Sequence, residues 1–165
     1  MDESEKLRNK QASLGLRESA FKTKITDLQG VQPLGDYRIF GAIMEMGYAQ
    51  GFATIACFIT GDASIYFSNG GGMLGGIHHQ IVRDAALKFI QFSLNFITVF
   101  KRTDIHPFPE AEQAHFYILS QDGVYTTQAL TNDLGDKRSE LAPLFFAGQD
   151  VITAYRMIKP KMEEY

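Results

Sequence analysis

The chain has no tryptophan, one cysteine and no apolar run long enough to cross a bilayer. Cys57 lies in the apolar segment 52–59, where a thiol usually packs as a small hydrophobic group, so neither a disulfide framework nor a reactive thiol is indicated. The longest apolar stretch, 89–100, is interrupted by four polar residues and favours a core helix. We therefore predict no membrane span.

Basic charge is also scarce. The 16 Lys and Arg residues against 19 Asp and Glu residues give a net charge of −3. Nucleic-acid-binding surfaces normally carry a basic patch, so nucleic acid is not an expected partner. Residues 1–6 are acidic and polar, unlike the basic and then apolar start of a secretory signal, which predicts a cytoplasmic protein.

Apolar residues, by contrast, are plentiful: they make up 45% of the chain, and 13 of them are Phe. This is enough for one aromatic core that needs no disulfide or metal. Residues 1–30 predict an accessory helix with a frayed start, because Leu7, Leu14, Phe21 and Leu28 form a narrow stripe seven residues apart that Gly15 weakens. Residues 31–165 predict a single α+β domain.

Within that domain the periodicity predicts a five-stranded, mainly antiparallel sheet with a long central helix and a C-terminal helix packed on it. The turns Gly61-Asp62 and Asp122-Gly123 predict two hairpins that belong to one sheet. The expected strands are 38–46, 52–60, 63–68, 115–121 and 124–129, and the expected helices are 77–100 and 141–158.

The helix 77–100 is expected to pack on the sheet through Ile81, Ala85 and Phe89. Its apolar arc is wider than one sheet face covers, so the N-terminal helix, the C-terminal helix or a second copy must cover the rest. We predict a homodimer, with an interface made of Leu87, Phe92, Leu94 and Phe96.

A glycine cluster, residues 68–76, connects a predicted strand to this helix. Backbone N–H groups of such a loop and the helix N-terminus can hold an anion; the candidate ligand-binding residues are Gly70, Gly71, Gly72, Gly75, Gly76, His78 and His79. The context departs from a dinucleotide fold, because the cluster follows an antiparallel hairpin, and from a P-loop, because no Lys-Ser/Thr follows. A tight turn with close helix packing is the favoured interpretation.

Chemistry-bearing residues form no recognisable catalytic or metal motif. His78 and His79 are adjacent and do not chelate one ion together. Ser68 or Cys57 with His79 lacks a nucleophile-elbow sequence. Glu45, an acid inside an apolar strand, is expected to face solvent, the alternative being an inward acid with a shifted pKa. No catalytic residue, metal ligand or cofactor is predicted.

The element order over 37–158 (three strands, a long helix, two strands and a helix) resembles that of the roadblock and longin group of profilin-like domains. It departs from the roadblock pattern, which has two strands before the central helix and three after it. The chain also looks like bacterial proteins of unassigned function that share the strand, glycine cluster and helix. The roadblock resemblance implies a non-catalytic scaffold that dimerises and binds small GTPases.

Three classes of function follow, in decreasing order of preference. The first is a self-associating, non-catalytic interaction module. The second is a sensor that binds an anion or small ligand at the loop 70–76. The third is an enzyme of unrecognised type.

Overall fold

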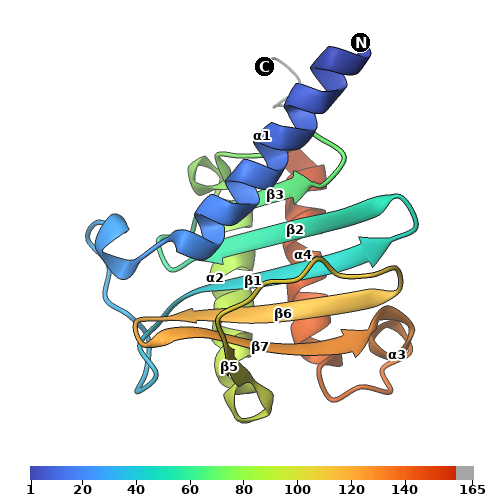
Figure 1. Cartoon of the computed structure of the whole chain (residues 1–165). Coiled ribbons are helices and arrows are strands. Elements are labelled where there is room, and N and C mark those ends of the chain that lie inside the picture. The colour runs from blue at the N-terminus through green and yellow to red at the C-terminus, as the bar shows by residue number, and fades with distance from the viewer. Residues whose placement is uncertain (159–165) are drawn as a thin grey trace.

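A seven-stranded antiparallel sheet forms the centre of the computed structural model, which describes residues 1–158 (Figure 1). Its strands are β1 (Ile39–Tyr48), β2 (Gly51–Phe58), β3 (Ala63–Phe67), β4 (Gly72–Met73), β5 (Lys101–Thr103), β6 (Gln113–Ser120) and β7 (Gly123–Leu130), in the order β4-β3-β2-β1-β6-β7-β5. The helices are α1 (Glu3–Lys22), α2 (Gln80–Leu94), α3 (Thr131–Gly135) and α4 (Ala142–Ile158), with short 3-10 turns at 25–27, 76–78 and 97–99.

The α+β class and the placement of both hairpins in one antiparallel sheet are confirmed. The prediction of five strands is wrong, because β4 and β5 lie in segments that the sequence indicates as loops. These two strands have two and three residues and form the sheet edges. Such short pairings have no hydrophobic periodicity to detect, since a strand pattern needs at least four alternating residues.

The helix α2 is shorter than the predicted helix 77–100, because 3-10 turns replace both of its ends. The residue facing the core is Val82, fully buried, whereas the predicted contact Ile81 is 37% exposed. Ala86 and Ile90 continue the buried row, and Phe89 is buried as predicted. Two neighbouring rows of this helix are apolar, and periodicity alone does not say which of them faces the sheet.

The wide apolar arc of α2 is covered by α4, which packs beside it on the same face of the sheet (Figure 1). The helix α1 lies on the opposite face and takes no part in this cover. Among the four predicted interface residues, Phe92, Leu94 and Phe96 are half-buried against this core, and Leu87 is also half-buried. An intramolecular partner thus accounts for much of the apolar surface from which the α2-mediated dimer was predicted.

The helix α1 begins at Glu3, where the Asp2 side chain caps it by accepting a hydrogen bond from the Glu5 N–H at 2.7 Å. The predicted seven-residue stripe is right in part: Phe21 is buried and Leu14 and Leu28 are half-buried, but Leu7 is 56% exposed. The buried residues of the helix are Phe21 together with Ser13, Arg17 and Ala20, which lie outside the stripe, and residues 1–12 are all exposed. Two of these four contacts are polar, which is why an apolar stripe does not reveal them.

Candidate functional site

The sheet face beneath α1 carries a row of polar side chains across its three central strands. Glu45 on β1 lies opposite Thr54 on β2 and opposite His115 on β6. All three residues are buried, and Glu45 is 0% exposed. The expectation that Glu45 faces solvent is therefore wrong: it points away from the α2–α4 layer, as strand alternation requires, but α1 covers it.

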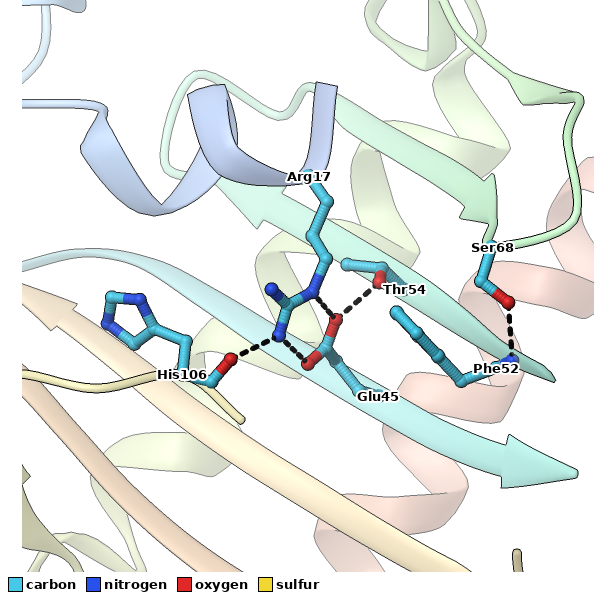
Figure 2. A network of polar contacts seen from close by, with 6 residues as sticks. All are labelled: Arg17, Glu45, Phe52, Thr54, Ser68 and His106. Atoms are coloured by element: carbon cyan, nitrogen blue, oxygen red, sulfur yellow. Dashed lines mark hydrogen bonds and ion pairs between the residues drawn. The ribbon is translucent and has the colours of Figure 1, made fainter. Parts of the chain in front are cut away.

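Arg17 of α1 closes over this row and forms a two-pronged ion pair with Glu45 (Figure 2). The Arg17 Nε donates to Glu45 Oε2 at 2.6 Å and Nη2 donates to Oε1 at 2.7 Å. The Thr54 hydroxyl also donates to Oε2, and Arg17 Nη2 donates to the His106 carbonyl at 2.9 Å. Because both carboxylate oxygens accept hydrogen bonds, this arrangement holds α1 on the sheet and leaves no free carboxylate for acid–base chemistry.

Aromatic rings surround the Arg17 guanidinium. Its Cζ lies 4.9 Å from the ring centroid of Phe21, 5.5 Å from that of Phe52 and 4.9 Å from that of Phe108. A planar guanidinium suits such a place, since it stacks on rings while it bonds a carboxylate with its edge. We call Glu45, Thr54, Phe52, Phe108 and the His106 carbonyl the guanidinium cage.

The segment between β5 and β6 completes the cage by crossing in front of the sheet (Figure 1). Its His106 ring stacks on Phe21 with the centroids 4.1 Å apart, and both rings meet Tyr117 edge-on. Gly47 permits this crossing, because a Cβ there would lie 1.8 Å from the Glu110 carbonyl oxygen. The backbone of the segment therefore rests directly on β1.

The buried His106 Nε2 has no hydrogen-bond partner among the described residues. Burial lowers the pKa of His106, and the Arg17 charge lowers it further, against smaller opposing effects of Glu45 and Asp104. Burial also lowers the pKa of His115, and the main effect that opposes this shift is the negative charge of Glu45, which raises the pKa. The lowered pKa values favour the neutral form of both rings where α1 is docked.

We expect the protein to lose stability as the pH falls from about 7.5 to 5.5. Below the ordinary histidine pKa of 6.5 the unfolded chain takes up protons that the folded His106 and His115 resist, so acid favours unfolding until the lowered folded pKa values are reached. Urea unfolding at a series of pH values measures this slope. In the His106→Phe variant, which keeps the stacking, the slope should shrink; a stability that rises on acidification would contradict the prediction.

A groove of about 750 Å³ opens beside the cage, between the projecting half of α1, the β1–β2 turn and the segment 108–111. Leu7, Tyr48 and Phe108 line it with exposures of 56%, 52% and 57%. Its charged lining consists of Glu3, Lys6, Lys10 and Glu110. We call this surface the α1 groove. It presents exposed apolar side chains together with both signs of charge.

The glycines of residues 68–76 make close contacts with other segments of the same chain. Gly70 and Gly71 have left-handed φ angles of 115° and 84°, and the Gly71 carbonyl accepts a hydrogen bond from Ser13 of α1 at 2.9 Å. Gly72 lies in β4, where a Cβ would be 2.2 Å from the Ile65 carbonyl oxygen. Turn geometry and close backbone approach thus account for these three glycines.

At the other end of the cluster, Gly75 has a left-handed φ of 77° and Gly76 packs tightly against the core. The Asp62 carboxylate accepts a hydrogen bond at 3.2 Å from the N–H of Ile77, which lies in the 3-10 turn that precedes α2. His78 is exposed, and His79 is the half-buried N-cap of α2 and makes no capping bond with its side chain. The predicted ligand-binding residues therefore fall into two groups, one beside α1 and one at α2.

The other chemistry-bearing residues are separated. Cys57 is buried, and this burial strongly raises the pKa of its thiol. The Ser68 hydroxyl accepts a hydrogen bond from the Phe52 N–H at 2.8 Å. Within residues 1–158 no three His, Cys, Asp or Glu side chains gather as a metal site. Over the same residues no helix combines the length and apolar character that a bilayer span requires.

Comparisons with known proteins give no indication of function, so the proposals below rest on the geometry of the site. No family model, no curated protein and no solved structure matches the chain. The site with the most polar and aromatic contacts, the cage around Arg17, was missed from the sequence. Its only signal was one acid, Glu45, in an otherwise apolar strand, and its partner lies 28 residues away in a helix that suggests no pairing.

Proposed function

We propose that the protein is a non-catalytic interaction module that self-associates through the α1 groove. The observation that carries this proposal is the projecting half of α1: residues 1–12 are exposed, yet they wall a groove in which Leu7, Tyr48 and Phe108 are more than half exposed. Adjacent exposed apolar side chains with polar neighbours are typical of protein–protein contact surfaces.

The charges of the groove favour a second copy as the occupant. A two-fold interface brings one surface patch against itself, so a charged patch avoids self-repulsion when it carries both signs of charge. Lys6 and Lys10 lie one helical turn apart on α1, and Glu110 lies on the facing segment. In a two-fold contact the lysines of each copy face the Glu110 side of the other. A strongly acidic or strongly basic partner would instead meet like charges.

Sedimentation equilibrium of the full chain tests the proposal. We expect a dimer that the Leu7→Glu variant weakens at least tenfold, because the new carboxylate would be buried in the contact. Leu7 is 56% exposed within its own chain, so the fold and the circular dichroism spectrum should remain unchanged.

The matched control is Phe96→Glu on the α2 face, which the sequence favours as the interface. If the α1 groove is the contact, this variant should keep the dimer, although Phe96 packs partly on the core and its stability must be checked. Dimer loss in Phe96→Glu with Leu7→Glu unaffected would move the interface to α2. A monomer at all concentrations would refute self-association. Binding of a small GTPase, which the roadblock resemblance implies, remains a separate prediction.

A further inference from the structure

The helix α1 is attached to the rest of the chain as a separable arm. It is buried only through Ser13, Arg17, Ala20 and Phe21, and its first twelve residues are exposed. The segment 23–38 that joins it to β1 has no fully buried residue. Sixteen extended residues reach roughly 50 Å, which is enough to carry the arm to another molecule.

The sheet face on which α1 packs is unfavourable to expose to solvent. When α1 leaves, it uncovers the buried Glu45 carboxylate and removes Ala20 and Phe21 from the apolar cluster that also contains Ile43, Ala56 and Leu119. An apolar face with an uncompensated carboxylate at its centre is costly to leave open in the absence of a guanidinium. Either its own arm or that of another molecule must therefore supply Arg17.

The joining segment 23–38 contains one turn whose extension would let α1 move away from its own chain. Leu34 and Ile39 exchange two backbone hydrogen bonds, 2.8 and 3.0 Å long, so the chain folds back tightly just before β1. Inside this turn Arg38 has a left-handed φ of 52°, a conformation that is unfavourable for a residue with a Cβ. Extending the segment would release Arg38 from this conformation.

We infer that α1 is exchanged between two copies, so that Arg17 of each copy occupies the guanidinium cage of the other. This inference rests on the self-association proposed above and specifies its mode. The α1 groove places the arms where exchange can occur, because the projecting half of α1 forms one wall of the proposed contact. Exchange of an identical element is a low-cost route to a dimer, since the contacts of the closed monomer are reused.

Complementary charge reversals in the full chain test the exchange. In R17E both the arm and the cage carry an acid, and in E45R both carry an arginine. Neither variant can therefore dock its own arm or that of an identical copy. In an equimolar mixture, the Arg17 arm of E45R meets the Glu45 cage of R17E, and the reversed pair forms at the second cage. We expect a heterodimer at protein concentrations at least tenfold below those at which either variant alone dimerises, measured by native mass spectrometry.

Three companions complete the design. The double variant R17E/E45R should regain wild-type dimerisation, because each arm again matches each cage. If circular dichroism shows that a charge reversal does not fold, R17Q mixed with E45Q gives the same test with one native pair per dimer. R38G should weaken the wild-type dimer about tenfold, since glycine removes the cost of the left-handed φ in the closed chain.

The results separate this inference from the proposed function. A wild-type dimer with no heterodimer enrichment in either mixture overturns arm exchange, assigns α1 to the face of its own chain and leaves self-association standing. A wild-type monomer, unaffected by mixing, refutes both.

Discussion

Replacing Arg17 by Met should lower the free energy of unfolding by about 3–5 kcal/mol, because it leaves the Glu45 carboxylate buried without its counter-ion. Methionine keeps most of the length and apolar contacts of the arginine side chain, so the loss reports mainly on the charge. Of the present contacts to Glu45, only the Thr54 hydroxyl would remain. Urea denaturation of both proteins at pH 7 measures the difference.

An exposed ion pair on the same chain provides the control for Arg17→Met. Arg138 and Asp133 approach to 2.8 Å, but their side chains are 62% and 42% exposed. Arg138→Met should therefore change the stability by less than about 1 kcal/mol. A double variant in which Arg17→Met is combined with Glu45→Leu should recover most of the loss, since no buried charge is left. Equal effects of Arg17→Met and Arg138→Met would contradict the buried ion pair.

The sequence reveals those parts of the fold that have a local pattern. The hairpin at Asp122-Gly123 and the buried strand β2 follow from turn residues and apolar runs of eight residues or so, and both are present. The short edge strands β4 and β5 escape detection because their backbone pairing needs no particular side chain. The prediction placed Ile81 of α2 against the sheet, whereas the buried residue is its neighbour Val82. Both residues belong to apolar rows, so periodicity does not distinguish them.

The candidate site depends on contacts between distant segments, and this is why the sequence does not reveal it. Arg17, Glu45 and His106 come from a helix, a strand and a loop. Each of these residues alone has an ordinary solvent-exposed alternative. Only the crossing of segment 104–112 over Gly47 and the docking of α1 bring them together. The glycine cluster shows the converse: it attracts a functional interpretation, yet its geometry is explained by turns and packing.

Gly76→Ala should lower the free energy of unfolding by about 2–4 kcal/mol, as the sum of overpacking and a lost buried hydrogen bond. A Cβ at this position would lie 2.6 Å from both Tyr155 Oη and Val82 Cγ1 and 2.8 Å from the Ala63 carbonyl oxygen. Tyr155 is fully buried, and its hydroxyl donates to that same carbonyl, so neither group can move without breaking this bond. The φ of Gly76 lies outside the left-handed region, which leaves packing as the cause.

Gly15→Ala is the matched control for Gly76→Ala, because a Cβ at Gly15 meets no atom within 4 Å and the residue lies inside α1. Alanine there should stabilise the helix by about 0.5–1 kcal/mol. Tyr155→Phe, which removes only the hydroxyl, should lose about 1 kcal/mol and so separates the hydrogen bond from the crowding. If Gly76→Ala proved as stable as the wild type, close packing would not explain this glycine. A thermal-shift screen of anions on the wild type and Gly76→Ala would then test the alternative, a ligand-binding role for the turn 76–78.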